Sequence, residues 1–238
     1  MHLKQCKITI ALSSRALFDL EQENSIYENK GTSEYEKYQI EHESDTLAPG
    51  AGFPLAKALL KLNTAEKKHI EVIVLSRNNP CVSIRIMNSI KKHGLDITRA
   101  AFTSGSGIAK YLNAFGVSLY LSRNPEDVRG ALNNSIAAGL LYATTTNYTD
   151  DIKEIRIAFD ADAVIFSAES ERVFKKDGLD AFIQHEIKNA NRLLPEGPFA
   201  NFLKTLTILQ QQSNSDIKIN LAIITARCSP THDRIIKT

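Results

Sequence analysis

The chain of 238 residues is long enough for one large domain or two ordinary ones. Its 43% hydrophobic content is enough to build a core, so we do not expect a disordered protein. The 29 basic and 27 acidic residues leave a formal charge of +2, so we expect neither a nucleic-acid polymer nor a membrane as partner. Three widely spaced cysteines indicate buried thiols in a reducing, cytoplasmic environment. The sequence has no apolar stretch of about 18 residues, so we expect a soluble protein. A homo-oligomer is possible on this composition.

The first part of the chain alternates apolar strands with helices, which predicts an α/β fold with a Rossmann-like, mostly parallel sheet and flanking helices. Asn124 is the expected N-cap of one helix, and the segment after residue 18 has the pattern of a turn or loop. The type of an apolar element at 137–143 stays undetermined. We expect strands at 6–12, 71–75, 100–103 and 117–121, and helices at 34–43, 54–62, 80–91, 108–113 and 125–132.

The polar, aperiodic segment 144–151 marks the boundary between two domains, which we place at residues 1–148 and 149–238. Beyond this segment the pattern of the first domain begins again. We expect strands at 156–159 and 218–224, and helices at 169–176, 179–189, 199–210 and from Pro230 onward.

Two carboxylates, Asp160 and Asp162, follow the predicted buried strand 156–159. Because ligands of an open α/β sheet collect outside the carboxyl ends of its strands, both side chains would stand at the mouth of a crevice. There Asp160 can attack a phosphate as a nucleophile and Asp162 can donate and recover a proton, provided that a cation offsets the negative charges. The alternative is a loop with two solvated aspartates.

Three further segments have a functional and a plain interpretation. Thr225 ends the strand 218–224, so its hydroxyl either holds a phosphate beside the carboxylates or is simply a polar strand end. Arg227 either contacts the substrate or points to solvent. The segment Ser104-Gly-Ser-Gly107 before a helix is either a phosphate cradle or a short turn.

An ordered series of matches indicates that the two domains are related halves of an internal repeat. Residues 10–16 match residues 157–163, and the series continues through the following helices, where His42-Glu43 is matched to His185-Glu186. In the first domain Ser13 and Arg15 replace the two carboxylates. Only the second domain is therefore expected to carry out carboxylate chemistry.

Two segments at the candidate site resemble motifs of a known superfamily. Residues 159–166, which contain Asp160 and Asp162, resemble the first motif of the haloacid-dehalogenase superfamily of phosphotransferases, and residues 223–227 resemble its second. Over nearly its whole length the chain is similar to the cytosolic 5'-nucleotidase type I family. This similarity lies in Ser13–Asp19, Tyr38–Glu43, Phe53-Pro54, Asn88–Ile90, Ser170–Arg172 and Gly178–Asp180.

The resemblance implies a haloacid-dehalogenase-like fold and Mg²⁺-dependent removal of the 5'-phosphate from nucleoside monophosphates, AMP being the commonest substrate of the family. It makes Asp160 the nucleophile that becomes an aspartyl-phosphate, Asp162 the acid and base, and Thr225 the phosphate-holding hydroxyl. Asp160 and Asp162 would also hold the metal, through oxygen atoms of the kind that Mg²⁺ prefers.

The resemblance also places a lysine motif and a further acidic pair beyond Thr238. We therefore expect the first domain to be a degenerate copy, the second to be a catalytic half that is incomplete at its C-terminus, and the natural chain to continue past Thr238. The alternative from another functional class is a non-catalytic nucleotide-binding or interaction protein, or an inactive fragment without the C-terminal motifs.

Overall fold

The structure is a computed structural model that describes residues 8–142, 151–212 and 217–238. The chain divides into two compact units, the first up to Ile152 and the second from Lys153 onward, and each is described by itself. The predicted boundary at residues 148 and 149 lies outside the described residues, and so does Cys6.

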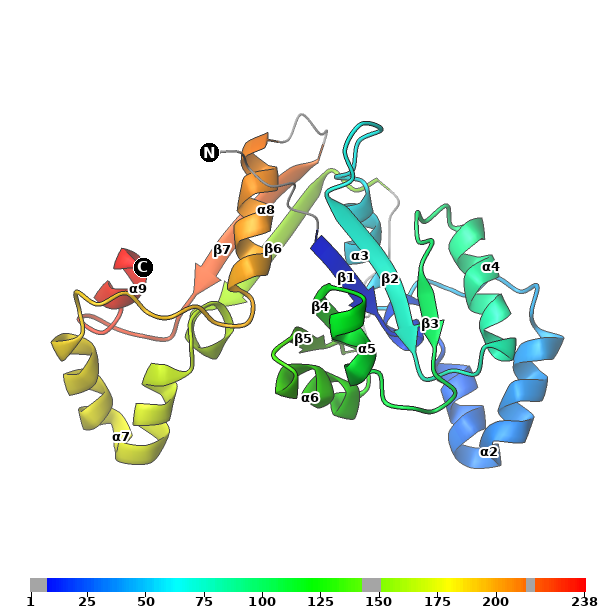
Figure 1. Cartoon of the computed structure of the whole chain (residues 1–238), viewed down its shortest axis with the longest axis horizontal. Coiled ribbons are helices and arrows are strands. Elements are labelled where there is room, and N and C mark those ends of the chain that lie inside the picture. The colour runs from blue at the N-terminus through cyan, green and yellow to red at the C-terminus, as the bar shows by residue number, and fades with distance from the viewer. Residues whose placement is uncertain (1–7, 143–150, 213–216) are drawn as a thin grey trace. The chain divides into compact units, whose positions relative to one another are not determined.

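The first unit is built around a five-stranded parallel sheet (Figure 1). Its strand order is β3-β2-β1-β4-β5, so the chain first extends the sheet on one side of β1 and then returns to extend it on the other. The reversal between β1 and β4 is the switch point at which such sheets bind ligands. The predicted α/β fold is confirmed. The strands are β1 (Ile8–Leu12), β2 (Ile70–Ser76), β3 (Ala100–Phe102), β4 (Val117–Ser122) and β5 (Ala137–Leu140).

Helices cover both faces of this sheet, because alternate residues of its central strands point to opposite sides and both sets are apolar. Ile73 and Leu75 of β2 join a core cluster with α5 (Ala109–Ala114) and α6 (Pro125–Asn133). Val72 and Val74 face the other way and are just as fully buried. The remaining helices are α1 (Ser14–Leu17), α2 (Glu21–Glu41), α3 (Phe53–Leu60), the 3₁₀ turn η1 (Cys81–Ser83) and α4 (Ile84–Lys92).

The second unit is smaller and contains two parallel strands, β6 (Glu154–Asp160) and β7 (Lys218–Ile224). Its helices are α7 (Glu169–Lys188), α8 (Ala200–Gln212) and α9 (Asp233–Lys237), and a tight turn, η2 (Ala161–Ile165), follows β6. The core forms where α8 covers one face of the sheet, with the rings of Phe159 and Phe202 6.1 Å apart.

Strand β6 differs from the prediction of a fully buried strand. Ile155 and Phe159 are buried, whereas Arg156 and Ala158, which alternate with them, are exposed. A strand covered by helices on a single face alternates in this way, and the short apolar run did not distinguish it from a strand buried on both faces.

Helices α2 and α7 are each broken by a glycine. Gly31 (φ 81°, ψ −178°) interrupts α2, and Gly178 (φ 83°, ψ −175°), 147 residues later, interrupts α7. Both helices are hairpins of two segments, as Figure 1 shows. The second hairpin was predicted as two helices, but the first segment of α2 was predicted as a turn or loop. That prediction was wrong because the segment is polar on all sides and has no hydrophobic period.

Other predicted elements lie close to their observed bounds. Asn124 caps α6 by accepting hydrogen bonds from the backbone N–H groups of Glu126 at 2.8 Å and Asp127 at 3.3 Å, as predicted. The apolar element of undetermined type contains β5. The cysteine prediction was wrong, because Cys81 and Cys228 are exposed.

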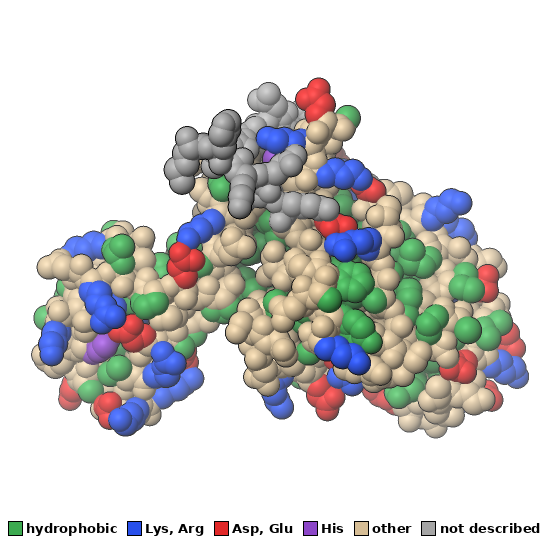
Figure 2. All heavy atoms as spheres, viewed as in Figure 1, with side chains coloured by type: hydrophobic (Ala, Val, Ile, Leu, Met, Phe, Trp, Pro, Cys, Tyr) green, Lys and Arg blue, Asp and Glu red, His purple; other side chains and the backbone are tan. Residues whose placement is uncertain are grey.

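Charged side chains of both signs are interspersed on the face of the molecule shown in Figure 2. A mixed surface of this kind produces no strong single-sign field. Among the helices that the structure describes, none is both long and apolar enough to cross a membrane.

Candidate active site

The candidate active site lies at the carboxyl end of the sheet in the second unit. Strands β6 and β7 pair in parallel over their whole length, and their last pair joins Asp160 to Ile224. Thr225 follows Ile224 directly. The exposed carboxylate of Asp160 and the hydroxyl of Thr225 therefore leave neighbouring strands at the same edge, which is the position where α/β sheets bind ligands.

The turn η2 carries the second carboxylate away from β6. Asp162 has an extended backbone, whereas Ala163 adopts a left-handed conformation with φ 59°. This conformation is unfavourable for alanine and persists only where the surrounding structure enforces it. A hydrogen bond of 3.0 Å from the Phe166 N–H to the Ala161 carbonyl closes the turn.

Asp162 forms a two-pronged ion pair with Arg227. The Arg227 Nε donates to Asp162 Oδ2 at 3.0 Å, and Nη2 donates to Oδ1. The Arg227 side chain is 4% exposed, and its guanidinium lies 5.1 Å from the centre of the Phe182 ring. Burial lowers the pKa of Arg227, but the hydrogen bonds and charges of Asp162 and Glu186 outweigh burial and raise it. Arg227 is thus a charged group held inside the unit, a position that neither sequence interpretation described.

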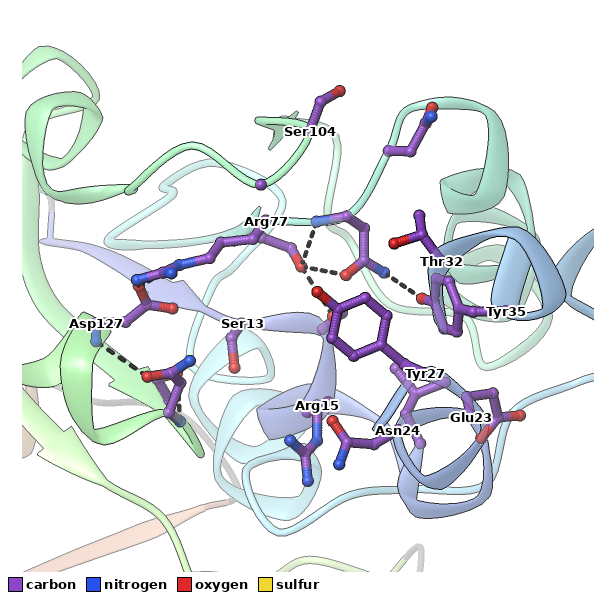
Figure 3. Close-up of a pocket in the computed structure, with 18 of the residues that line it drawn as sticks. Ser13, Arg15, Glu23, Asn24, Tyr27, Thr32, Tyr35, Arg77, Ser104 and Asp127 are labelled. Carbon is purple, nitrogen blue, oxygen red and sulfur yellow. Dashed lines mark hydrogen bonds and ion pairs between the residues drawn. The ribbon is translucent and has the colours of Figure 1, made fainter. Parts of the chain in front are cut away.

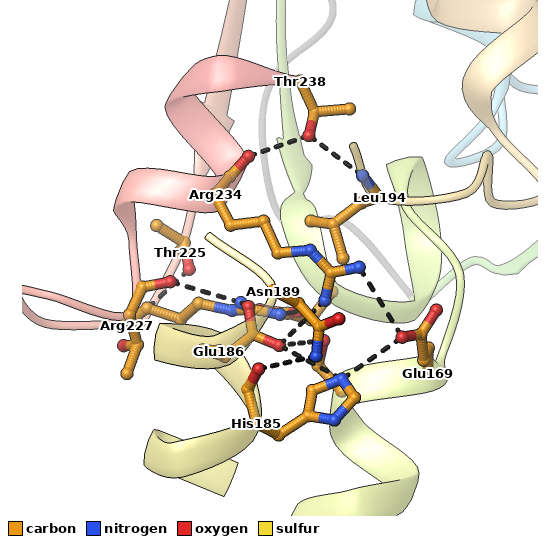
Figure 4. A network of polar contacts seen from close by, with 12 residues as sticks. Glu169, His185, Glu186, Asn189, Leu194, Thr225, Arg227, Arg234 and Thr238 are labelled. Atoms are coloured by element: carbon orange, nitrogen blue, oxygen red, sulfur yellow. Dashed lines mark hydrogen bonds and ion pairs between the residues drawn. The ribbon is translucent and has the colours of Figure 1, made fainter. Parts of the chain in front are cut away.

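A buried network around Glu186 fixes Arg227 from its other side (Figure 4). One Glu186 oxygen accepts hydrogen bonds from Ser170 Oγ at 2.7 Å and Arg234 Nη1 at 3.1 Å, and the other accepts from Arg227 Nη1. Arg234 Nη2 lies 3.6 Å from Glu169 Oε1, an ion pair just beyond hydrogen-bond range. Because a buried charge is costly unless it is paired, the carboxylate of Glu186 holds both guanidiniums in place.

Thr225 is oriented by the same segment of chain. Its Oγ1 accepts a hydrogen bond of 3.2 Å from the backbone N–H of Arg227. A hydroxyl that accepts one hydrogen bond still has its own proton to donate. Thr225 is therefore able to donate to an anion at the sheet edge.

The three predicted site residues thus have different environments. Asp160 and Thr225 stand at adjacent strand ends, and Asp162 is turned toward Arg227. Sequence reasoning missed the buried network of Ser170, Glu186 and Arg234. The internal repeat contained a signal for it, since Arg234 corresponds to Arg85, which is also buried.

The site offers hard oxygen atoms to a cation. Among the described residues, no group of three or more His, Cys, Asp or Glu side chains could hold a metal ion. The Asp160 carboxylate and the backbone carbonyls of the turn are nevertheless the type of donor that Mg²⁺ uses. Because Mg²⁺ keeps several waters and also binds phosphate oxygens, it needs few protein ligands, and these oxygen donors are of the type that it binds.

Comparison with known proteins agrees with this chemistry. A model of the 5'-nucleotidase family matches residues 1–238. Human cytosolic 5'-nucleotidase 1B is 33% identical over 244 residues, an alignment that covers 97% of this chain and 40% of the human protein. The chain thus spans less than half the length of this curated relative. No solved structure matches it. On these matches and this fold, the chain belongs to the 5'-nucleotidase family.

Proposed function

We propose that this protein hydrolyses nucleoside 5'-monophosphates, with AMP as the first substrate to test, and that the reaction takes place at Asp160. The observation that supports this most is the register of β6 and β7, which sets an exposed carboxylate beside Thr225. Family membership supports the substrate class, and the name of the human relative supports a cytoplasmic location.

The proposed reaction has two steps. In the first, an Asp160 carboxylate oxygen attacks phosphorus, the bond from phosphorus to the nucleoside oxygen breaks, and Asp162 gives its proton to that oxygen. In the second, water attacks the aspartyl-phosphate, releases the Asp160 carboxylate and returns a proton to Asp162. Thr225 donates a hydrogen bond to the phosphate throughout.

A phosphate beside Asp160 needs positive charge. Mg²⁺, held by the Asp160 carboxylate and the Asp162 backbone carbonyl, would supply charge that offsets the repulsion between the two anions. Arg227 can supply more. Its guanidinium binds both oxygens of Asp162, so Asp162 can act on the substrate only when Arg227 changes partner. A substrate phosphate is a suitable new partner, because guanidinium binds phosphate in the same two-pronged way.

The test is phosphate release from AMP in the presence of Mg²⁺. Asp160→Asn should lower the rate about a thousandfold or more, because it removes the nucleophile without changing the size of the side chain. Asp180→Asn, an exposed position in α7, is the control and should leave the rate unchanged. An Asp160→Asn protein that turns over like the wild type would show that the nucleophile lies elsewhere.

One observation favours a second candidate, nucleotide binding without turnover. Both side-chain oxygens of Asp162 are engaged by Arg227, which leaves the acid and base occupied. Calorimetry with AMP and Mg²⁺, run beside the phosphate-release assay, separates the two. Binding without release in the wild type supports this second function, and release of phosphate at a steady rate removes it.

A further inference from the structure

The first unit contains a cavity of about 440 Å³ at the carboxyl edge of its own sheet (Figure 3). Residues at the carboxyl ends of four of its strands line it, among them Ser13 after β1, Ser76 at the end of β2, Ser104 after β3 and Ser122 at the end of β4. The cavity thus opens at the switch point between β1 and β4, and its volume lies in the range of small-molecule sites. The segment with Ser104, predicted as either a cradle or a turn, is part of its wall.

The cavity corresponds to the candidate active site of the second unit. The spacing that separates the two kink glycines also pairs Ser13 with Asp160 and Arg15 with Asp162. Ser13 Oγ accepts a hydrogen bond of 3.2 Å from the Ala16 N–H. A serine needs an adjacent base to become a nucleophile, and here the residue two positions on is a cation instead. The first unit therefore keeps the place for a ligand without the groups for hydrolysis.

Two arginines beside the cavity share a single carboxylate. Arg15 and Arg123 both pair with one carboxylate, Glu21, at 3.0 and 2.5 Å. The Nε of Arg15 is buried and has no hydrogen-bond partner among the described residues. The carboxylate of Glu23, which also lines the cavity, is paired with the buried Arg85 at 2.7 Å. Two further carboxylates line the cavity: Asp127 is paired with Arg77 at 2.5 Å, and Glu36 accepts a hydrogen bond of 3.1 Å from the Asn79 amide. An anion at Arg15 would supply an acceptor for the free Nε donor, beside a carboxylate that two arginines share.

An aromatic side chain lies beside this charge. Tyr27 is 51% exposed and packs edge-on against Tyr35, with ring centres 5.9 Å apart. Figure 3 shows Arg15, Asn24 and Tyr27 on the same side of the cavity. A ring that is half exposed can stack on a planar base, and the neighbouring amide can donate and accept hydrogen bonds at its edge.

We propose that this cavity binds a nucleoside 5'-monophosphate and does not hydrolyse it. The phosphate lies at Arg15 and Ser13, where this unit has a hydroxyl in place of the carboxylate of Asp160. The base lies against Tyr27. The choice of ligand rests on the proposed function, because the second unit is the related site to which the substrate class is assigned. Binding here requires no divalent cation, whereas binding at Asp160 does.

The test uses the fact that the chain contains no tryptophan. Tyr27→Trp places a single fluorescent reporter at the cavity, and Phe174→Trp places the matched reporter in the second unit, where Phe174 packs on Phe182 with ring centres 6.1 Å apart. With AMP in EDTA, Tyr27→Trp should show a saturable change in emission and Phe174→Trp should stay silent. Addition of Mg²⁺ should make Phe174→Trp respond.

The two proposals fail in different ways. If Tyr27→Trp does not respond to AMP, the further site is refuted, whatever Phe174→Trp does. If only Phe174→Trp stays silent with Mg²⁺, the proposed function is in error and the further site stands. Adenosine should bind Tyr27→Trp about tenfold or more weakly than AMP, since it lacks the phosphate. Equal affinity for adenosine and AMP would contradict the phosphate contact.

A pair of substitutions at Ser13 tests the charge without loss of the fold. Aspartate and asparagine are both good N-caps, so each can replace the hydrogen bond that Ser13 makes at the start of α1. In the Tyr27→Trp protein, Ser13→Asp should weaken AMP binding about tenfold or more, because a carboxylate then faces the phosphate. Ser13→Asn should keep most of the affinity. Equal weakening by both would place the phosphate elsewhere and overturn the assignment.

Discussion

The first and second units each bury one arginine under a helical hairpin, Arg85 in one and Arg234 in the other. Each arginine donates from Nε to a backbone carbonyl of the chain that leaves the hairpin, that of Asp45 at 3.2 Å and that of Arg192 at 2.7 Å. The kink glycines stand at the same position in both hairpins. The two units have therefore kept one local structure although most of their side chains differ.

The difference lies in the carboxylate that neutralises this arginine. Arg85 Nη1 donates to a Glu23 carboxylate oxygen at 2.7 Å and to the Gln39 amide oxygen at 3.2 Å. In the second unit the equivalents are Ser170, eight residues before the glycine, and Glu186, eight residues after it. The carboxylate has moved from one hairpin segment to the other. Arg85 and Arg234 each still form a hydrogen bond with one carboxylate, although Glu186 also binds Arg227. The pairing has thus been kept, whereas the position of the carboxylate has not.

The buried arginines give one part of the repeat a different register from the one that the sequence matches gave. His42-Glu43 was matched to His185-Glu186, but the structure pairs Gln39 with Glu186, because both accept a hydrogen bond from the buried arginine of their own unit. The two His-Glu dipeptides were matched because they are identical, although they are not structurally equivalent. The hydrogen bonds identify the equivalent residues more reliably than the residue type does.

The largest expected effect on stability comes from Glu186→Gln. This change leaves Arg227 and Arg234 buried without their shared carboxylate, and loss of one partner of a buried ion pair costs about 3–5 kcal/mol. Urea unfolding of the chain measures this cost. Glu171→Gln, which breaks an exposed pair with Lys175, should cost less than about 1 kcal/mol. Similar losses in the two variants would show that the buried network does not stabilise the second unit.

The sharpest test of the comparison is a rearrangement within the first unit. Glu23→Gln alone should cost about 3 kcal/mol or more, because Arg85 then lacks a carboxylate. The double variant Glu23→Gln with Gln39→Glu moves the carboxylate to the position that it has in the second unit, and should recover most of the loss. Urea unfolding of the wild type, both single variants and the double variant forms a complete cycle. If the double variant is no more stable than Glu23→Gln, Gln39 and Glu186 are not equivalent.

Replacing each kink glycine should have a smaller effect that is equal in the two units. Gly31→Ala and Gly178→Ala force a side chain into a backbone region that is essentially restricted to glycine, at a cost of about 1–3 kcal/mol each. A Cβ at either position meets nothing within 4 Å, so the cost is conformational and not steric. Gly107→Ala has the same open surroundings without a left-handed backbone and serves as the control. Thermal unfolding measures the loss in each variant. If Gly31→Ala and Gly178→Ala unfold at the same temperature as Gly107→Ala, a side chain at the kinks causes no backbone strain.

The smallest expected effect concerns pH. Burial raises the pKa of Asp127, against the opposing effect of its hydrogen bond and charge interaction with Arg77. The folded protein therefore holds this proton more tightly than the unfolded chain, and stability is lost as the pH rises from about 4 through the raised pKa. Relative to the wild type, Asp127→Asn should gain unfolding free energy across that window and show a constant difference above it. Urea unfolding at several pH values measures this difference. A decrease in the stability of the variant relative to the wild type as the pH rises would contradict the prediction.

Much of the fold followed from short-range patterns. The strand 218–224 and the cap at Asn124 were predicted at their observed positions, because β-branched runs and Asn-Pro at a helix start are strong local signals. The first segment of α2 was missed because most of its side chains are exposed and its one buried side chain, Glu23, is charged, so no hydrophobic period appears in the sequence.

The candidate site was predictable in part for a similar reason. Asp160 and Thr225 could be placed together because both end parallel strands, and parallel strands share an edge. The ion pair of Asp162 with Arg227 could not be predicted, because it depends on a left-handed conformation at Ala163. Such a conformation is usually indicated by a glycine in the sequence, and this position is an alanine. The buried network was missed because a glutamate and two arginines in amphipathic positions are indistinguishable from surface charges until their burial is known.

The movement of the carboxylate between hairpin segments has a consequence for how this gene can change. A crossover between the two copies at the kink glycine would join one segment from each. One product would bring Ser170 together with Gln39 and leave Arg85 without a carboxylate, while the other would bring Glu23 together with Glu186 beside Arg227 and Arg234. The first of these hybrid hairpins would carry an unpaired buried charge. Recombination between the repeats is thus disfavoured at this point, and the two halves are free to diverge without being made uniform again by exchange.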